Sequence, residues 1–318
     1  MTDWPIVLFY HQVLRRPRPD HVFFRQSLTL DEFRAALELV QRRHRVLSAD
    51  EMYRVRQQGG RFPPRSVLIT FDDGFRNNLL AAEILNQLGL SASFFVLSET
   101  LDGQFVPWYL RLAHILSTRR RETCTAPWGP VRFADTLARR RWQAAAKEHL
   151  LASPPDRRDA ELNQLACDLE CPPLDPADED YQFLDSADLR RMRELGMTVG
   201  GHGATHDNLA RCNEVELRRE MLDSADRLAA ASGGPIEDFS YPDGRYDDRV
   251  LALARQRYRM AFAASCHVRL SDLWRIPRRG ADDYRDVARV LSRWYPWRRR
   301  AAETAKRFLR EPGASKSS

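Results

Sequence analysis

The feature that most constrains the fold of this chain is a repeated alternation of short apolar runs with longer stretches of helical periodicity. The runs are rich in β-branched and aromatic side chains, which is typical of strands buried on both faces. Strands that alternate with helices pair in parallel, so the pattern predicts an α/β fold. About seven such units favour a distorted (β/α) barrel over an open sheet. The predicted strands are residues 6–10, 67–71, 92–97, 197–200, 236–241, 259–264 and 274–277.

The alternation is interrupted in the middle of the chain. From about residue 103 to 182 the sequence is rich in Arg, Ala and Leu, has helical stretches and shows no convincing strand. The 318 residues are therefore expected to form one barrel domain over 1–286 with a helical insertion at about 103–182. Residues 287–318 are expected to form a basic C-terminal helix and tail.

In barrels of parallel strands the chemistry lies beyond the carboxyl ends of the strands, so the residues that follow each strand are candidates. Asp72, Asp73 and Gly74 follow the second strand. Both carboxylates can serve one site only if the chain turns sharply, which Gly74 permits. Two neighbouring carboxylates in different surroundings can act as metal ligand and general base. A solvated turn is the plainer alternative, although the end of a buried strand is a poor place for idle charge.

A pair of histidines, His202 and His206, follows the fourth predicted strand. Two imidazoles four residues apart can bind one metal ion if the segment turns or begins a helix. The spacing is common by chance, so the pair alone is a weak signal. Together with Asp73 it would supply three ligands and leave one position for water, as in catalytic zinc sites.

Three further strand ends carry polar groups. After the fifth strand, Tyr241, Asp243 and Gly244 belong to a turn that could direct backbone N–H groups toward the strand ends as oxyanion donors, or could be a simple β-turn. His11 follows the first strand and could be structural or catalytic. Arg278 follows the last strand and could orient an aspartate or bind an anion.

Three of these segments, taken in order, resemble the motifs of the polysaccharide deacetylase family, also called the NodB-homology family or carbohydrate esterase family 4. They are TFDDG at 70–74, GHGATHDNL at 201–209 and FSYPDGRYD at 239–247. The resemblance covers about 1–100 and 183–280 and leaves the helical insertion outside. It implies a distorted (β/α) barrel that removes N- or O-acyl groups from sugars with the help of a divalent metal.

The resemblance implies a role for each matching residue. Asp73, His202 and His206 become the ligands of a divalent metal ion, with Zn²⁺ expected and Ni²⁺, Co²⁺ or Mn²⁺ as alternatives. Asp72 becomes the general base. The backbone N–H of Asp243 becomes the oxyanion donor. Its neighbours Tyr241 and Gly244 are then expected to lie at the substrate.

The opening segment LFYH at 8–11 resembles the start of the poly-N-acetylglucosamine deacetylase branch. In that branch the family's Leu-x-His-type motif is permuted to the N-terminus, and its histidine is the general acid. The resemblance therefore implies His11 as the acid. His267 is a second candidate for that role.

Three positions depart from the family's pattern. Gly203 stands where a small hydroxyl residue usually follows the first metal histidine, and Asp243 stands where an aromatic residue is common. Ser240 replaces a common arginine, so Arg278 is expected to orient Asp72 instead. These departures bear on the substrate more than on the reaction.

The function that the sequence predicts is metal-dependent removal of an N-acyl group, acetyl above all, from an amino sugar. The substrate would be an oligo- or polysaccharide or a lipid-linked glycan precursor. One alternative is a barrel that has lost activity and only binds saccharide. Another is a deformylase of a lipid-linked amino sugar.

The formal charge of +6 and the pI of about 9.2 suit an anionic partner without choosing one. Basic residues and the aromatic residues Trp294, Tyr295 and Trp297 cluster near the C-terminus. They could form a surface helix at an anionic bilayer or pack on the barrel. No nucleic-acid motif accompanies them, so no nucleic-acid partner is expected. The N-terminus lacks the pattern of a signal peptide, so we expect a cytoplasmic protein, with possible peripheral contact at the inner membrane face.

Overall fold

The computed structural model provides the coordinates of the chain. It describes residues 4–16, 27–175, 178, 181–264, 272–282, 287 and 291.

The main sheet consists of parallel strands whose spatial order follows their order along the chain. The predicted strands are present, with ends shifted by at most two residues. A two-residue strand, β4 (Arg45–Val46), pairs beside the start of β5. The main strands are β1 (Ile6–Tyr10), β5 (Ser66–Phe71), β6 (Ser93–Val96), β9 (Thr198–Gly201), β10 (Asp238–Ser240), β11 (Met260–Ala263), β12 (Ile276–Pro277) and β13 (Arg279–Gly280).

One short segment joins the two edges of this sheet. β12 and β13 are separated only by Arg278, and β12 pairs with β11 while β13 pairs with β1. The Arg278 N–H donates to the Ala263 carbonyl at 3.0 Å, and the Ala281 N–H donates to the Phe9 carbonyl at 2.9 Å. The sheet is therefore nearly closed, and the predicted (β/α) barrel of about seven parallel strands is confirmed.

Side chains alternate between the inside and the outside of the barrel, as strand geometry requires. Leu68 and Phe95 point inward, and the Phe95 ring contacts Phe262 although β6 and β11 are not neighbouring strands. Ile69 and Phe94 belong to the outer layer, which packs against the helices. Burial on both faces explains why these strands read as continuous apolar runs.

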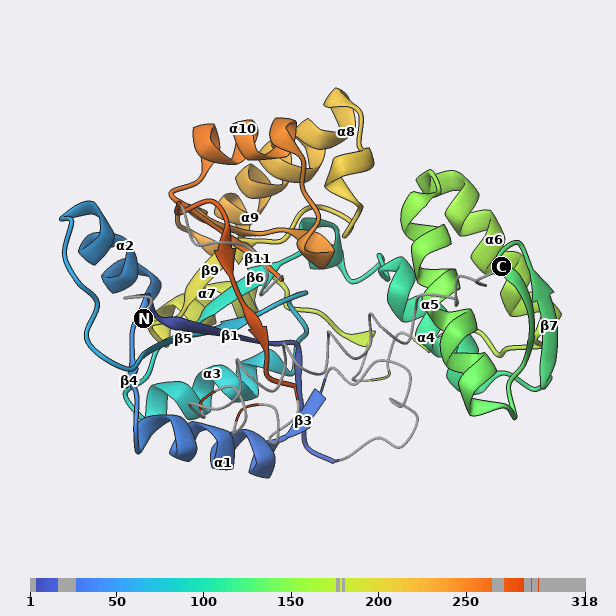
Figure 1. Cartoon of the computed structure of the whole chain (residues 1–318), viewed down its shortest axis with the longest axis horizontal. Helices are drawn as coiled ribbons and strands as arrows, with labels where there is room; N and C mark the ends of the chain where they lie inside the picture. The colour runs from blue at the N-terminus through green and yellow to red at the C-terminus, as the bar shows by residue number, and fades with distance from the viewer. Residues whose placement is uncertain are drawn as a thin grey trace, which may run out of the picture.

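The helices surround the barrel (Figure 1). The segment between β9 and β10 contains a π-helical turn, labelled η5, which lies between two α-helices. The two-stranded sheet of β2 (Gln12–Leu14) and β3 (Ser27–Thr29) lies beside the barrel. The helical elements of the barrel are α1 (Leu30–Gln41), α2 (Ala49–Gln57), α3 (Asn78–Gln87), η2 (Ser98–Asp102), α7 (Ser186–Glu194), η4 (Leu209–Arg211), α8 (Glu214–Arg218), η5 (Arg219–Asp223), α9 (Ser224–Ser232), η6 (Pro242–Gly244) and α10 (Asp248–Arg257).

The segment between η2 and α7 forms a lobe beside the barrel, drawn in green in Figure 1. It contains α4 (Trp108–Thr118), α5 (Thr136–Ala152) and α6 (Pro155–Asp168), which enclose a separate apolar cluster. It also contains an antiparallel hairpin of β7 (Thr123–Ala126) and β8 (Gly129–Arg132). The expectation of a segment without strands is therefore wrong. These two strands contain glycine, proline and small polar residues, so they lack the run of β-branched and aromatic side chains that predicts a strand.

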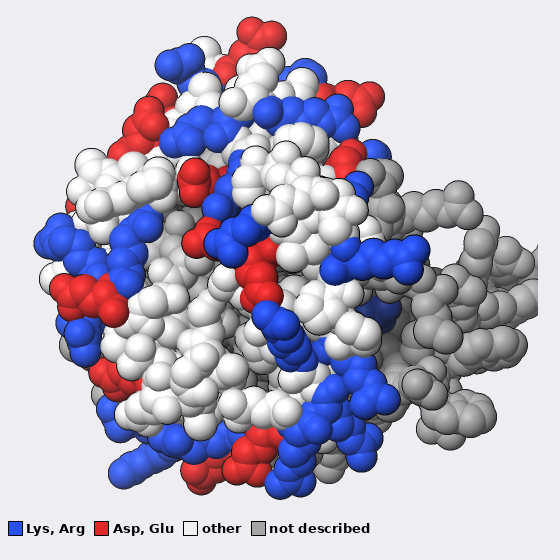
Figure 2. Space-filling view, turned by 90° about the vertical axis from the view of Figure 1, so that its left-hand side faces the viewer, with Lys and Arg blue, Asp and Glu red and all other residues white. Residues whose placement is uncertain are grey.

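The charged side chains of the barrel face that carries α2 are mixed in sign. Figure 2 shows basic and acidic side chains interspersed there. The basic segment expected over 287–318 lies outside the described residues, apart from Val287 and Leu291. Its contact with a bilayer therefore stays a prediction. Within the described part of the chain, no helix combines the length and the apolar character that a membrane span requires.

Candidate active site

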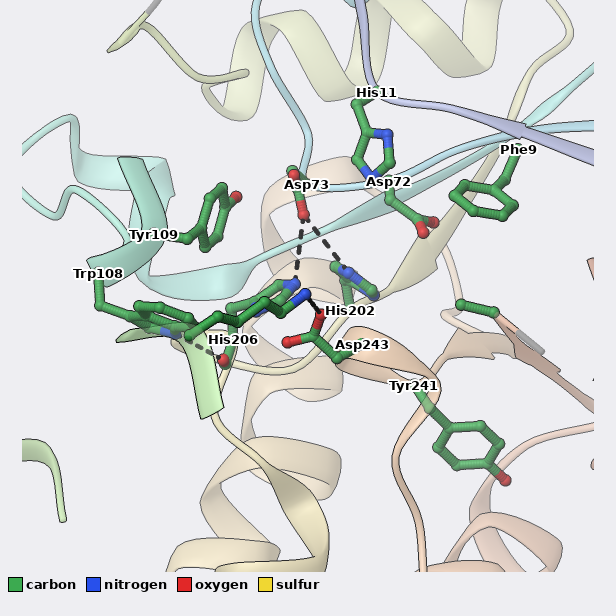
Figure 3. Close-up of a pocket in the computed structure, with 12 residues that line it drawn as sticks. Phe9, His11, Asp72, Asp73, Trp108, Tyr109, His202, His206, Tyr241 and Asp243 are labelled. Carbon is green, nitrogen blue, oxygen red and sulfur yellow. Dashed lines mark hydrogen bonds and ion pairs between the residues drawn. The ribbon is translucent and has the colours of Figure 1, made fainter. Parts of the chain in front are cut away.

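A cavity of about 290 Å³ lies at the carboxyl ends of the strands, between the barrel and the lobe. It gathers residues from distant parts of the chain (Figure 3). They are Phe9, His11, Asp72, Asp73, Trp108, Tyr109, Lys147, His202, His206, Tyr241, Asp243 and Ala264.

The turn after β5 brings two carboxylates into this cavity. Asp73 and Gly74 both have a left-handed backbone, with φ of 74° and 76°. A Cβ at Gly74 would lie 2.8 Å from Val96 Cγ1, so only glycine fits here. The sharp turn lets Asp72 and Asp73 face the same cavity, as the sequence pattern required.

Asp73, His202 and His206 form a buried cluster. His202 Nε2 lies 3.4 Å from Asp73 Oδ1, and His206 Nε2 lies 3.7 Å from the same oxygen. The ligand atoms of the three residues lie within 4.8 Å of one another. His202 Nδ1 lies 2.8 Å from the Ser240 carbonyl, which fixes this nitrogen as the donor and leaves Nε2 free to bind a metal.

The chemistry of this cluster fits a divalent cation. Asp73 Oδ1 is buried and has no hydrogen-bond partner among the described residues. Burial alone would raise the Asp73 pKa, but the adjacent His202 ring and the charges of the nearby histidines lower it. One ionised carboxylate and two imidazoles form the ligand set of many catalytic zinc sites, which also keep an open position.

Arg278 and Asp72 form a buried, two-pronged ion pair. The guanidinium nitrogens Nη1 and Nη2 donate to Asp72 Oδ1 and Oδ2 at 2.8 and 2.6 Å. Arg278 Nη2 also donates to Ser240 Oγ at 2.7 Å, so the small residue at 240 contacts this arginine directly. Burial would raise the Asp72 pKa, but Arg278 and His202 lower it, and the carboxylate stays ionised.

His11 is held by an acidic residue that the sequence analysis did not identify. Asp282 accepts hydrogen bonds from the His11 backbone N–H at 2.8 Å and from Nδ1 at 2.9 Å. Burial alone would lower the His11 pKa, but Asp282 and the aspartates of the cavity raise it to about 9. His11 is therefore protonated near neutral pH. The position of Asp282 just after the last strand was a usable signal. The alternative acid, His267, lies outside the described residues.

In the turn after β10, the backbone N–H of Asp243 can still donate a hydrogen bond, whereas those of its neighbours are already used. The Tyr241 N–H donates to the Phe262 carbonyl, and the Gly244 N–H donates to the Tyr241 carbonyl. The Tyr241 side chain points away from the Asp73–His202–His206 cluster in Figure 3, and its hydroxyl donates to the Trp274 carbonyl at 3.0 Å. Asp243 has φ of 53°, and its N–H has no partner among the described residues.

The lobe supplies three cavity residues that sequence reasoning missed. Trp108 Nε1 donates to the His206 carbonyl at 3.3 Å, and the Tyr109 ring lies 4.8 Å from the His206 ring. Lys147 forms an ion pair with Asp243 Oδ1. The only signal for these residues was the rarity of lysine in a chain whose basic residues are almost all arginine.

Glu220 in the π-helical turn accounts for the glycine at position 203. Its carboxylate accepts hydrogen bonds from the Ala204 N–H at 2.8 Å and from Thr205 Oγ1 at 2.7 Å. A Cβ at Gly203 would lie 2.6 Å from Glu220 Oε2, and the φ of Gly203 is 90°. A glutamate thus occupies the space beside the first histidine of the cluster.

The sequence from residue 59 to 260 matches the family model described as polysaccharide deacetylase. The chain belongs to the polysaccharide deacetylase family. Family membership indicates carbohydrate de-N-acetylation. No curated protein matches the sequence.

Solved structures share the fold of this chain at low identity. The Streptococcus pyogenes deacetylase PplD in complex with acetate has a TM-score of 0.57 and 16% identity, over 91% of this chain and 98% of that chain. IcaB from Ammonifex degensii also has a TM-score of 0.57 and 16% identity, over 91% and 97%. A de-N-acetylase from Aggregatibacter actinomycetemcomitans has a TM-score of 0.52 and 15% identity, over 86% and 93%.

Proposed function

We propose that this member of the polysaccharide deacetylase family is a metal-dependent hydrolase that removes the acetyl group from an N-acetylated amino sugar. The substrate is an oligo- or polysaccharide or a lipid-linked glycan precursor. One observation carries the proposal. Asp72, held by Arg278, and His11, held by Asp282, line the same cavity as the Asp73–His202–His206 cluster.

The cluster of Asp73, His202 and His206 would hold the divalent metal ion. When bound, such an ion acts as a Lewis acid toward the acyl group and lowers the pKa of water. The two imidazoles offer neutral nitrogen ligands, and Zn²⁺ suits this set best. The contact between His202 Nδ1 and the Ser240 carbonyl fixes the orientation of that ring.

Asp72 is the general base in this proposal. Arg278 binds both of its oxygens, yet each carboxylate oxygen has a second lone pair that can accept a proton from the attacking water. The same ion pair fixes the direction of the carboxylate. Water attacks the acyl carbon, and the electron pair of the carbonyl bond moves to the acyl oxygen.

His11 and Asp243 act on the leaving group and on the developing charge. The Asp243 N–H donates to the acyl oxygen as negative charge develops on it. When the intermediate collapses, the bond between the acyl carbon and the nitrogen breaks, and His11 gives its proton to the departing amine. The products are acetate and a free amino sugar.

The test is product release from N-acetylated chito-oligosaccharides by the full chain, stripped of metal and reloaded with Zn²⁺. We expect acetate and free amine in equal amounts, and loss of both after chelation. Asp72→Asn should keep bound zinc but lower kcat by about 100-fold or more, as expected for a missing general base. Exposed Asp31→Asn is the matched control.

Three results would count against parts of this proposal. Wild-type rates in Asp72→Asn would remove the base assignment. Unchanged zinc content in a His202→Ala, His206→Ala double variant would remove the ligand set. Saccharide binding without release of any acyl product across acetylated and formylated sugars would favour a binding protein instead.

A further inference from the structure

Tyr109 is the residue of the lobe whose chemistry the proposed function leaves unused. It lies in the first turn of α4, lines the cavity and is 7% exposed. Its ring packs against His206, and Figure 3 shows its hydroxyl turned toward Asp73. The lobe therefore places a phenol next to the metal-ligand cluster.

The Tyr109 hydroxyl is buried and has no hydrogen-bond partner among the described residues. Leaving a buried polar group unpaired destabilises the folded state, so a wall that only needed an apolar ring would favour phenylalanine. Two other buried tyrosines do have partners for their hydroxyls. The hydroxyls of Tyr241 and Tyr258 donate to backbone carbonyls. Tyr10 also lacks a partner, but it does not line the cavity.

The protonation state of Tyr109 makes it a donor. A phenol has an ordinary pKa of about 10, so it is protonated near neutral pH. The phenol therefore keeps its proton and can donate a hydrogen bond. Its neighbour Trp108 already uses its indole N–H on the His206 carbonyl, so within this pair only the phenol is available to a substrate.

We propose that Tyr109 is a catalytic residue that donates a hydrogen bond to the acyl oxygen of the substrate as negative charge develops on it. The inference rests on the proposed deacetylation. The phenol keeps its proton throughout: water bonds to the acyl carbon, the carbonyl electron pair moves to the oxygen that Tyr109 stabilises, and it returns when the carbon–nitrogen bond breaks. Tyr109 and the Asp243 N–H then form a two-donor oxyanion site, with one donor from the lobe and one from the barrel.

Tyr109→Phe removes the hydroxyl and keeps the ring against His206. On an N-acetylated chito-oligosaccharide we expect kcat to fall by about 100-fold with KM within twofold of wild type, the usual effect of losing one oxyanion donor. Tyr181→Phe is the matched control, because the Tyr181 hydroxyl lies 3.3 Å from His114 Nδ1, outside the cavity. It should keep wild-type kcat.

Zinc affinity separates this role from a structural one. A phenol that only held Asp73 in place would change the affinity for Zn²⁺ by about 10–100-fold when removed. We expect the zinc dissociation constant of Tyr109→Phe, measured against a chromophoric chelator, to stay within twofold of wild type. A loss of kcat that follows a loss of zinc would overturn the proposal.

Methylphosphonate gives a readout that does not need turnover. This tetrahedral anion resembles the charge and shape of the intermediate, so the zinc-loaded wild type should bind it at least tenfold more tightly than Tyr109→Phe. If the wild type hydrolyses no acyl sugar, the proposed function fails, while this comparison still decides the role of the phenol. Equal affinities, or no binding to the wild type, would overturn it.

Discussion

At the scale of single residues, the site is built from backbone conformations that most side chains avoid. Five non-glycine residues in the described part of the chain have positive φ, and Asp73, His206 and Asp243 are three of them. Such a conformation costs about 1–3 kcal/mol per residue and persists only where the surrounding structure enforces it. Here the positive φ of Asp73, His206 and Asp243 turns the chain after β5, in the histidine loop and after β10. Their side chains or N–H groups therefore face one cavity.

A prediction at this scale concerns the His11–Asp282 pair. Asp282 raises the His11 pKa, so replacing it with Asn should lower that pKa from about 9. A general acid works only when protonated, and activity is therefore lost as pH rises through its pKa. The alkaline limb of the kcat/KM profile should move to lower pH in Asp282→Asn.

A variant outside the cavity controls for general effects on this profile. Asp272 pairs with Arg275 and does not line the cavity, so Asp272→Asn should leave the alkaline limb in place. An unmoved limb in Asp282→Asn would mean that His11 is not the acid that limits the rate at high pH.

At the scale of elements, the loop that carries the histidines is held by the helix that follows it. The π-helical turn η5 directs Glu220 toward the Ala204 and Thr205 N–H groups, and Gly203 leaves room for the carboxylate. A π-helical turn is rare and occurs often at functional sites. The irregular helix and the irregular loop therefore form one unit.

Glu220→Gln tests this unit. The amide would direct its NH₂ group at backbone donors, so we expect stability to fall by about 1–3 kcal/mol. Because the loop carries His202 and His206, two of the three proposed metal ligands, we also expect zinc affinity to fall by about 10–100-fold. Denaturant unfolding and zinc competition measure the two effects. Exposed Glu214→Gln should change neither. Wild-type zinc affinity in Glu220→Gln would show that the loop holds its shape without this carboxylate.

At the scale of the whole molecule, the lobe is attached to the barrel at the rim of the cavity. Arg158 in α6 binds Asp207 beside the histidine loop at 2.5 Å, and both side chains are largely buried. Glu148 in α5 binds Arg245 at 2.6 Å, next to the pair of Lys147 and Asp243. The apolar cluster of the lobe also includes Phe75 from the turn after β5, so apolar packing and these polar contacts together attach the lobe to the barrel.

Arg158→Met should loosen the lobe, because it leaves the Asp207 carboxylate buried without its partner. We expect a loss of about 2–3 kcal/mol of stability and faster hydrogen exchange in α4 to α6 than in the barrel strands. The adjacent Arg157→Met is the matched control, since Arg157 is exposed and its ion pair with Glu161 contributes little. Equal exchange rates in the two variants would show that this pair does not anchor the lobe.

The parts of this protein that the sequence predicted are those in which the signal is local. A strand buried on both faces needs a run of apolar residues, and residues 67–71 show it directly. The carboxylates and histidines follow their strands at once, so strand prediction was enough to bring Asp73, His202 and His206 to one end of the barrel. The hairpin of β7 and β8 has no such signal, because glycine, proline and short polar residues dominate it.

The tertiary structure alone decided the contacts between groups that lie far apart in the sequence. The sequence by itself determined the barrel, its active end and the residue types available there. It did not determine that Asp282 would hold His11, or that Tyr109 and Lys147 of the lobe would complete the cavity. These depend on how the lobe docks and how the last segment closes the barrel, and both are set by the packing of whole surfaces rather than by periodicity along the chain.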